Sequence, residues 1–430
     1  MTDPLRHDSI RSAACADDYD PNSMTVADAR AFIDRFVAPL GEAQRLALRA
    51  ALGHVLAEDV VSPFNVPLAD NSAMDGYALR HADVDGRDEV TLTVVGTAFA
   101  GHTFAGPIGA GECIRIMTGG VVPAGMDCVV PIEHTRLATP ENRDRVVFRG
   151  GIRRAQNLRY AGEDIREGSV VLRRGQYLRP AEIGLLASLG IGEVTVFRRL
   201  RVALFSTGDE LVSIGSPLHQ GQLYDSNRYT IYGMLVRMGV DVIDMGVVRD
   251  DPAAIEARFA QAAACADVVI TSGGVSVGEA DFIKQMLDRM GEVVFWKIAM
   301  KPGRPLAYGR IGRAHFFGLP GNPVAVMVTF YQFVREPLWK MMGRDPLPLL
   351  PVFKATCSAA LKKLPGRTEF QRGVLSAAPD GSWQVRPTGE QGSGILSSMV
   401  QANCFIVLPQ AQGDVAAGTE VDVQMLEGLI

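Results

Sequence analysis

The stretch from Asp267 to Gly303 combines a loop and side chains suited to phosphate chemistry. The run Val268 to Thr271 is apolar and β-branched, which predicts a buried strand that stops at Ser272-Gly273-Gly274. The segment Phe282 to Met290 has helical spacing of its apolar residues. A glycine-rich loop that ends at a helix N-terminus presents backbone N–H groups to an anion. The sequence therefore predicts a phosphate-binding loop here.

Three polar side chains at the end of this loop could act on the phosphate. Ser276 can donate its hydroxyl to a phosphate oxygen, and Glu279 and Asp281 could hold a divalent cation beside it. The plainer alternative is an ordinary glycine turn followed by two acids that complement the helix dipole. The loop matches neither the nucleotide P-loop nor the dinucleotide fingerprint, so the phosphorylated ligand must be of another kind.

Two lysines follow in the same unit of chain. Lysine is scarce in this arginine-rich sequence, yet Lys297 and Lys301 lie close together beside Pro302-Gly303. We expect a strand from Val293 to Met300, and residues an even number apart on an extended segment share a face. Both ammonium groups are therefore predicted to point into one cleft.

Composition limits the class of protein. A chain of 430 residues is expected to form about two to four domains, and its net charge of −5 argues against a nucleic-acid binder. The sequence contains no run that would cross a membrane, and residues 1–23 are expected to form a disordered lead-in without a signal-peptide core. Six cysteines lack C-x-x-C spacing, which predicts unpaired thiols and a cytoplasmic location.

The remainder of the chain divides by pattern. Helices are predicted at Val26–Val37 and Glu42–Ala51, and residues 63–157 have the short apolar runs and turns of a β-rich region. Strands and helices then alternate, which indicates a parallel sheet covered on both faces. The predicted elements are strand Val202–Ser206, helix Arg228–Met238, strand Asp241–Val247, helix Pro252–Ala264, and a long helix that starts after Asn322 and ends near Gly343. Short strands are expected from Val352 to Ile430.

Acidic or glycine-rich loops follow three successive strands of the predicted sheet. They are Thr207 to Glu210, Arg249 to Asp251, and Ser272 to Asp281. Ligands of open α/β sheets bind beyond the carboxyl ends of the strands, so these loops should border one crevice. Acids around an anion-binding loop imply a bridging metal ion, and Mg²⁺ is the simplest candidate.

A series of motifs in a fixed order then points to a family. They are DNSAMDGYA at 70–78, IRIMTGG at 114–120, GEDI at 162–165, LFSTGDEL at 204–211, DDP at 250–252, SGGVSVGEAD at 272–281, KPG at 301–303 and LPGNP at 319–323. With them, the chain from about residue 24 resembles the molybdopterin molybdenumtransferase family, the MoeA-type proteins related to the C-terminal domain of gephyrin.

The resemblance implies a multidomain α/β and β fold. It places a central doubly wound α/β molybdopterin-binding domain at 199–345, a β-rich inserted domain at 62–160, a small connecting domain from 24–61 and 161–198, and a C-terminal β-barrel-like domain at 346–430. It also implies the reaction. Molybdate is inserted into adenylated molybdopterin, AMP is released, and molybdenum cofactor is formed with the help of Mg²⁺.

The resemblance assigns roles to residues by matching motifs. Catalytic roles fall on Asp281, Lys297, Lys301, Asp75, Thr118 and Asp164. Substrate-binding roles fall on Ser272, Gly273, Gly274, Ser276, Pro320, Pro323, Arg372 and Ser393, and metal binding on Glu210, Asp250 and Asp281. Without the family, Asp75 and Thr118 would be interpreted as turn residues and Arg372 as a surface ion-pair residue.

Family members are homodimers, and the resemblance implies that Asp75 and Thr118 complete a site on the partner subunit. It implies further partners as well: the molybdopterin adenylyltransferase that supplies the substrate, and the molybdoenzyme apoproteins or cofactor carriers that accept the product. Two alternatives stay open, a molybdopterin adenylyltransferase and a gephyrin-like scaffold. The extra domains disfavour the first, and the lack of a fused second module disfavours the second.

Overall fold

The computed structural model describes the chain apart from residues 1–8, 12–13, 15–22, 140–141, 274–279 and 427–430. The described chain divides into two compact units. The α/β unit comprises residues 1–57, 175–179 and 193–430, and the β-rich unit comprises residues 58–174 and 180–192. Gly274 and Ser276 of the predicted phosphate loop lie outside the described residues.

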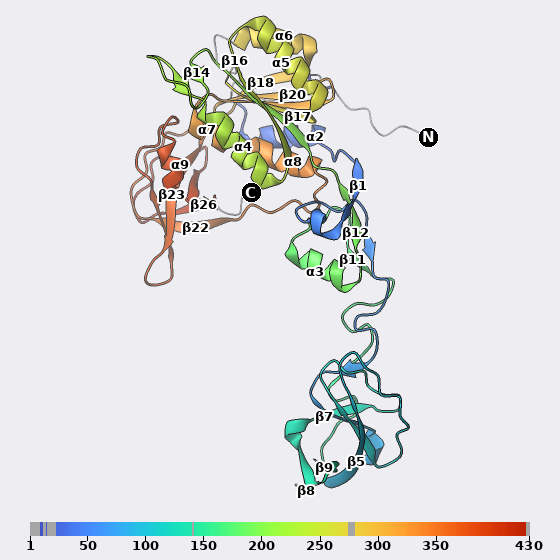
Figure 1. The fold of residues 1–430 in the computed structure, drawn as a ribbon. Helices are drawn as coiled ribbons and strands as arrows, with labels where there is room; N and C mark the ends of the chain where they lie inside the picture. The colour runs from blue at the N-terminus through green and yellow to red at the C-terminus, as the bar shows by residue number, and fades with distance from the viewer. Residues whose placement is uncertain (1–8, 12–13, 15–22, 140–141, 274–279, 427–430) are drawn as a thin grey trace. The chain divides into compact units, whose positions relative to one another are not determined.

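A six-stranded sheet organises the α/β unit, in the order β16-β13-β17-β21-β20-β18 (Figure 1). Its strands are β13 (Arg201–Thr207), β16 (Asp241–Val248), β17 (Val268–Ser272), β18 (Gly291–Lys297), β20 (Pro305–Ile311) and β21 (Ala314–Leu319). The first four strands in this order run parallel, whereas β20 and β18 run antiparallel to their neighbours. The expected parallel sheet is therefore a mixed one, because a hairpin returns the chain at one edge.

Helices cover both faces of this sheet, as the doubly wound prediction requires. One apolar core contains Phe205 with Phe259 of α5 (Pro252–Cys265) and Met286 of α6 (Ala280–Met290). The other contains Leu204 with Leu235 of α4 (Ser226–Met238). Residues 204 and 205 point to opposite faces because side chains alternate along a strand. The alternation thus fixes which helix packs on which face.

The helical run after Asn322 is interrupted. It consists of α7 (Pro323–Thr329), a π-helical turn (Phe330–Val334) and α8 (Arg335–Met341). Pro323 occupies the first helical position as predicted, but the Asn322 side chain makes no capping hydrogen bond. Helix α2 (Val26–Phe36) packs on the same core as α7, with Phe32 and Ile33 buried.

Two predicted elements are wrong. The segment Glu42–Ala51 is not a helix but strand β1 (Ala43–Ala47) and a 3₁₀ turn (Leu48–Ala51), because β1 pairs with β12 (Glu193–Phe197). Its alanines and leucines favour a helix, and the tertiary pairing overrides that preference.

The strand expected from Val293 to Met300 ends at Lys297. Lys301 belongs to a separate short strand, β19 (Met300–Lys301), which pairs with the C-terminal barrel. Lys297 and Lys301 therefore do not lie on one extended segment, contrary to the prediction.

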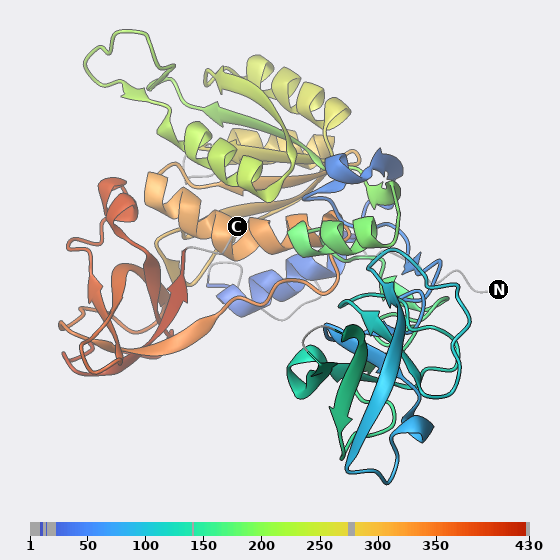
Figure 2. The same cartoon turned by 60° about the horizontal axis from the view of Figure 1, so that its bottom comes forward.

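A closed barrel forms the C-terminal part of the α/β unit (Figure 2). Its strands are β22 (Val352–Cys357), β23 (Thr368–Ala377), β24 (Trp383–Pro387), β25 (Cys404–Leu408) and β26 (Glu420–Met425), and α9 (Ser397–Gln401) lies between β24 and β25 in sequence. Pairing runs β23-β24-β22-β26-β25, and β25 pairs back to β23. This closure removes free edges, and the expectation of a barrel-like C-terminal domain is confirmed.

The β-rich unit contains a second six-stranded sheet, in the order β7-β4-β6-β5-β9-β8. These strands are β4 (Gly76–Leu79), β5 (Glu89–Ala98), β6 (Glu112–Ile116), β7 (Cys128–Pro131), β8 (Thr135–Thr139) and β9 (Asn142–Arg149). Two short pairs, β2 (Val60–Val61) with β11 (Val170–Leu172) and β3 (Asn71–Ser72) with β10 (Leu158–Arg159), flank it in sequence, and α3 spans Pro180–Ser188.

Several smaller expectations can be compared with the described residues. Ser9 to Arg11, within the segment expected to be disordered, pack on β18: Ile10 is buried and its N–H donates to Glu292. The described cysteines are Cys113, Cys128, Cys265, Cys357 and Cys404, and all are free thiols as predicted. In the described part of the chain, no helix is long and apolar enough to cross a membrane.

We predict that Phe259→Ala strongly destabilises the α/β unit. Phe259 is 2% exposed, and its ring lies edge-on to Phe205 at 5.0 Å and to Phe316 at 5.4 Å. Loss of a buried phenyl ring costs about 3–5 kcal/mol of unfolding free energy, which urea denaturation followed by tryptophan fluorescence would measure. Gln261→Ala, on the exposed side of the same helix, is the control and should change stability by less than about 0.5 kcal/mol. Equal midpoints for the two variants would contradict this account of the core.

Candidate active site

The carboxyl ends of β13, β16, β17 and β21 lie side by side, because these strands are parallel neighbours. The loops that leave them therefore start at one edge of the sheet, the place where the sequence predicts a ligand crevice. They begin at Gly208, Arg249, Gly273 and Pro320.

Asn227 joins two of these loops. It lies in the first turn of α4 and is 9% exposed, and its amide donates to Ser272 Oγ at 2.8 Å and to the Gly321 carbonyl at 2.7 Å. Asp225 caps the same helix by accepting from the Arg228 N–H, and it accepts from Ser206 Oγ at 3.0 Å. The start of α4 thus ties β13, β17 and the 320–322 loop together.

Gly273 brings the predicted phosphate loop close to β13. Its φ of +91° is in the region that favours glycine, and a Cβ there would lie 2.7 Å from the Thr207 carbonyl oxygen. Any side chain would force the loop away from the strand. The glycine is therefore required by close packing as well as by backbone conformation.

Two buried polar atoms at this edge of the sheet make no hydrogen bond within the described residues. They are Thr207 Oγ1 and Asn227 Oδ1. Each such atom costs about 1–3 kcal/mol when it is left unsatisfied. A ligand with polar groups could satisfy both atoms.

The acidic loops after β13 and β16 hold each other in place. The Asp209 N–H donates to Asp250 Oδ2 and the Asp250 N–H donates to Asp209 Oδ1, both at 3.2 Å. Among the described residues, no group of three His, Cys, Asp or Glu side chains is arranged to hold a metal ion. Mg²⁺ usually takes one or two carboxylates and completes its shell with phosphate oxygens and water. Asp250 could supply one such carboxylate, and the metal role of Asp250 and Glu210 stays a prediction.

A cavity of about 350 Å³ lies where the α/β domain meets the barrel within the α/β unit; we call it the cationic cavity. Its charged lining residues are Lys301, Arg304 and Arg367, and its remaining wall comes from glycine- and proline-rich segments at 302–303, 320–322 and 391–393. The Val324 N–H donates to the Ser393 carbonyl at 3.0 Å, which joins α7 to the barrel loop. Three cations around small residues form a site suited to an oxyanion.

Glu369 sets the position of Lys301. Lys301 Nζ lies 3.6 Å from Glu369 Oε1, and the carboxylate is only 3% exposed, whereas the lysine side chain is 47% exposed. Gln371 Nε2 donates to the other carboxylate oxygen at 3.0 Å. The acid is fixed below the surface and the ammonium group reaches the cavity.

Arg372 is buried rather than exposed to the cavity. It is 1% exposed, its Nε donates to Ser398 Oγ at 2.9 Å, and its terminal nitrogens donate to the carbonyls of residues 390–392 at 2.9–3.2 Å. Burial lowers the pKa of its guanidinium from the ordinary value. The surface ion-pair interpretation is wrong. Arg372 instead shapes the loop that carries Gln391 and Ser393.

The other predicted residues of this unit are distributed as follows. Lys301, Pro320 and Ser393 line the cationic cavity, whereas Pro323 begins α7 next to it. Lys297 ends β18 and is not part of the cavity lining. Asp281 lies in the first turn of α6, directly after the undescribed segment 274–279.

Sequence reasoning missed two residues, Asn227 and Arg367. Asn227 belongs to the polar run Asp225-Ser226-Asn227-Arg228, which opens an otherwise apolar helix, and that run was a usable signal. Arg367 comes from the turn before β23, and only the packing of the barrel against the α/β domain brings it to the cavity. No local pattern marks it.

Asp75, Thr118 and Asp164 belong to the β-rich unit. Asp75 Oδ1 accepts from both the backbone N–H and the hydroxyl of Thr118, each at 2.7 Å. The hydroxyl bond is the main cause that lowers the pKa of the Asp75 carboxyl below its usual value. Asp164 lies in the 162–165 loop and lines an open cavity of about 490 Å³ with Glu163 and Arg166.

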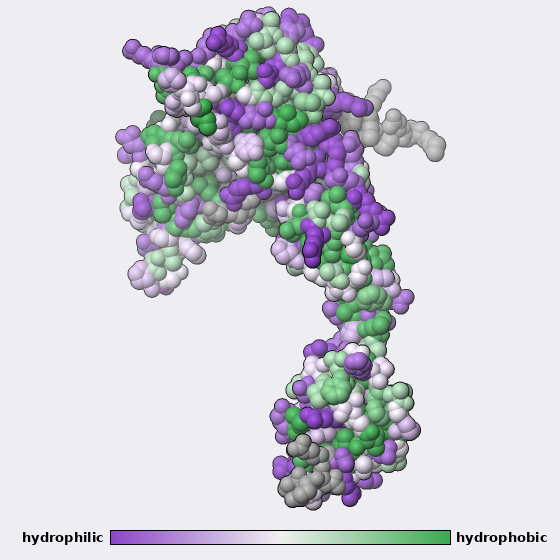
Figure 3. All heavy atoms as spheres, in the orientation of Figure 1, coloured by the Kyte–Doolittle hydropathy of each residue, from purple (hydrophilic) through white to green (hydrophobic). Residues whose placement is uncertain are grey.

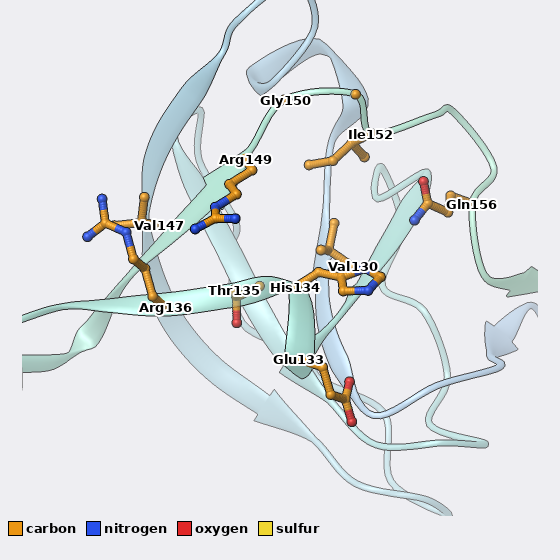
Figure 4. Close-up of a pocket in the computed structure, with 11 residues that line it drawn as sticks. Val130, Glu133, His134, Thr135, Arg136, Val147, Arg149, Gly150, Ile152 and Gln156 are labelled. Carbon is orange, nitrogen blue, oxygen red and sulfur yellow. The ribbon is translucent and has the colours of Figure 1, made fainter.

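The β-rich unit also has a cavity of about 370 Å³ beside β7, β8 and β9 (Figure 4). Glu133, His134, Arg136 and Arg149 line it, and Arg136 is paired with Glu89 at 2.6 Å. None of the predicted site residues lines this cavity.

Known protein families and individual relatives match this chain along most of its length. Residues 24–190 match the MoeA N-terminal region (domain I and II), 203–340 a probable molybdopterin binding domain, and 354–426 the MoeA C-terminal region (domain IV). The molybdopterin molybdenumtransferase of Haemophilus influenzae is 45% identical over 390 residues, which cover 90% of this chain and 95% of that protein. Molybdopterin molybdenumtransferase 2 of Mycobacterium tuberculosis is 38% identical over 87% of this chain and 93% of its own length.

The chain belongs to the MoeA family. The crystal structure of the molybdopterin biosynthesis moeA protein from Pyrococcus horikoshii OT3 superposes with a TM-score of 0.81 at 28% identity, covering 94% of this chain and all of that one. The resemblance and the multidomain fold class inferred from the sequence are confirmed. The crevice loops of this MoeA chain fall within the matched molybdopterin binding domain.

We predict that Thr118→Val raises the pKa of Asp75. The variant removes the hydroxyl donor and keeps the backbone N–H, so the carboxylate loses its main stabilising hydrogen bond. A pH titration of carboxyl carbons by NMR would measure the change. Asp380 is an internal control, because its carboxyl pKa is lowered in the same way by Ser382 and should not change. If the Asp75 titration is the same in both proteins, Thr118 does not determine its charge.

Proposed function

We propose that this protein is a molybdopterin molybdenumtransferase, which inserts molybdate into adenylated molybdopterin and releases AMP. The observation that carries the proposal is the cationic cavity of this MoeA chain, whose wall includes the 320–322 loop at the carboxyl end of β21. The relatives named molybdopterin molybdenumtransferase support the same activity. The reaction cleaves a phosphoanhydride and joins molybdenum to two dithiolene sulfurs, so it needs one site for phosphates and one for an oxyanion.

The crevice suits the adenylated substrate. Ser272 and Gly273 lie at its edge, and Thr207 Oγ1 and Asn227 Oδ1 offer unsatisfied polar atoms at its base. We assign Ser276, Gly274 and the catalytic carboxylate of Asp281 to the same substrate on the family's motif alone. Asp250 and Glu210 would hold Mg²⁺ together with the substrate phosphates, and the cation would neutralise charge at the anhydride.

The cationic cavity suits molybdate, a small dianion. Lys301, Arg304 and Arg367 supply charge-assisted hydrogen bonds, and Ser393 adds a hydroxyl. Pro320 and Pro323 shape the wall, and Arg372 fixes the 390–392 loop from behind. The catalytic role of Lys297 rests on the sequence prediction alone, because Lys297 does not line the cationic cavity.

Two other activities fit less well. A molybdopterin adenylyltransferase would need the crevice but not the barrel that supplies Arg367 to the cavity. A scaffold protein would need neither the paired acidic loops nor the buried unsatisfied atoms. We place the reaction in the cytoplasm, in keeping with the free thiols of the described residues.

We predict that Lys301→Gln raises the molybdate concentration for half-maximal cofactor formation by about ten-fold, because one charge-assisted contact is lost. The assay would supply adenylated molybdopterin, molybdate and Mg²⁺, and would measure AMP and cofactor together. Chelation of Mg²⁺ should stop both products. Lys362→Gln is the matched control, since Lys362 is 91% exposed and pairs with Asp414 on the barrel surface.

Absence of molybdate-dependent AMP release from the native protein would refute the proposed function. An unchanged molybdate dependence in Lys301→Gln would refute only the role of the cavity.

We propose further that the active form is a homodimer in which Asp75 and Thr118 of one subunit serve the crevice of the other. One face of α4 supports self-association, because Tyr229, Tyr232 and Val236 are 45–49% exposed at helical spacing. Figure 3 shows hydrophilic and hydrophobic residues interspersed over the side of the molecule on which α4 lies. We also expect transient contact with the adenylyltransferase and with apoproteins or carriers that accept the cofactor.

We predict that mixed dimers of Asp75→Asn and Lys301→Gln subunits recover activity at a molybdate concentration that supports the native protein but is too low for Lys301→Gln alone. Each mixed dimer would keep one site with both native residues, so about half of the dimers after random exchange would carry one working site. Native mass spectrometry would count the mixed dimers, and the AMP assay would measure activity. Mixed dimers that form but stay at the activity of the single variants would place both residues in one subunit's site.

A further inference from the structure

A second charged cavity lies at the other end of the α/β sheet, where β13 and β16 begin. It has a volume of about 550 Å³ and is lined by β1, the end of the 3₁₀ turn and the start of both strands. Its polar lining includes His54, Arg198, Arg199, Arg201, Glu42 and Asp241. The crevice described above lies at the carboxyl ends of the same strands, so the two sites are distinct.

Two buried nitrogen atoms of this lining make no hydrogen bond within the part of the chain that the structure describes. They are His54 Nδ1 and Arg199 Nε, and His54 as a whole is only 7% exposed. Arg199 Nε–H can only donate. Unsatisfied buried donors are rare because each is costly, so their presence on one cavity points to a ligand that carries acceptors.

The arginines differ in how fully they are paired. Arg198 donates to Asp267 at 2.6 and 2.8 Å and also binds Glu42. Arg201 lies 3.7 Å from Asp267, which is already bound by Arg198. Arg199 and Arg201 are therefore the arginines of the lining whose positive charge is least neutralised by an ion pair. Asp241 also lines the cavity, and Arg198 does not bind it.

The whole cluster is close to electrical balance. Arg198, Arg199 and Arg201 match Glu42, Asp241 and Asp267 one for one, so a bound anion needs one more positive charge. His54 is the titratable group of the lining that can supply it. Burial, and then the Arg199 charge, lower its pKa below the ordinary value of 6.5, while the backbone of Leu52 and Ala51, and then Asp241, act in the opposite direction. In the free protein His54 is neutral at pH 7, and an anion beside it would favour the charged ring.

We propose that this cavity binds an oxyanion group of the sulfate or phosphate type, held by Arg199 and Arg201, and that His54 takes up a proton as the anion binds. The anion would accept from Arg199 Nε and His54 Nδ1 and so satisfy both orphan atoms. It would also join His54, which lies three residues before the chain leaves this unit at Ala57, to the start of β13. The site is independent of the proposed transferase activity.

Sulfate is the probe, because its charge is constant between pH 5 and 8. Calorimetric titration of the full chain at constant ionic strength, in two buffers of different ionisation enthalpy, would give the affinity and the protons taken up. Bound His54 has the higher pKa, so affinity should rise as pH falls through that pKa and level off below the pKa of the free protein. Proton uptake should approach one per sulfate between the two values and vanish in His54→Gln.

Variants assign the binding to this cavity. Arg199→Gln should weaken the binding of sulfate about ten-fold, since it removes a charge-assisted donor. Arg45→Gln is the matched control, because Arg45 lies on β1 but pairs with Glu193 and does not line the cavity. Sulfate held in the cationic cavity instead would be weakened by Lys301→Gln and not by Arg199→Gln, and that result would overturn the proposal.

A readout on the native protein covers the case in which Arg199→Gln fails to fold. Histidine-labelled NMR, with His54 assigned from His54→Gln, should show the His54 ring titrating at higher pH when sulfate is present. An unchanged His54 titration at saturating sulfate would refute the proposal regardless of the variants. Repeating the titration with inorganic phosphate and with a phosphate monoester would distinguish a free anion from a phosphorylated metabolite as the natural ligand.

Discussion

The amide of Asn227 is the contact on which the crevice depends. One –NH₂ group donates to a side chain at the end of β17 and to a backbone carbonyl after β21. Ser272 leads into the glycines predicted to bind phosphate, and Gly321 belongs to the wall of the cationic cavity, so this one side chain holds the two points together. The residue is held in turn by the capped first turn of α4, where Asp225 binds both Arg228 and Ser206. A polar network at the start of a helix thus fixes the geometry of two loops.

Burial makes this network both rigid and incomplete. Asn227, Ser272 and Asp225 are all at most 9% exposed, so their hydrogen bonds do not compete with bulk water. The same burial leaves Asn227 Oδ1 and Thr207 Oγ1 unsatisfied among the described residues. The free protein loses free energy because these buried atoms make no hydrogen bond, and a ligand that bonds to them would restore it. The crevice is therefore better matched to a bound molecule than to solvent.

Much of this could be predicted from the sequence, because the decisive signals are local. The alternation of β-branched runs with amphipathic segments predicted β13, β16, β17 and the helices between them within a few residues. The acidic and glycine-rich loops after three successive strands predicted a ligand crevice at that edge of the sheet. The errors arose where pairing between distant segments decides the outcome. Ala43–Ala47 forms a strand only because Glu193–Phe197 pairs with it, and Lys301 leaves the line of β18 only because β23 captures Met300 and Lys301. Arg367 and the burial of Arg372 depend on how the barrel packs, which no local pattern contains.

The capture of Lys301 by the barrel also explains why the cationic cavity needs two domains. Met300 and Lys301 pair with Thr368 and Glu369, so the backbone of the lysine is fixed by the same strand whose acid fixes its ammonium group. Arg367 immediately precedes that strand, whereas Arg304 and the 320–322 loop come from the α/β domain. Glu369 offsets part of the charge of Lys301, so the carboxylate that positions the lysine also lowers the like-charge repulsion within the cavity. Under the proposed function, a bound dianion would offset more of that repulsion by lying among Lys301, Arg304 and Arg367.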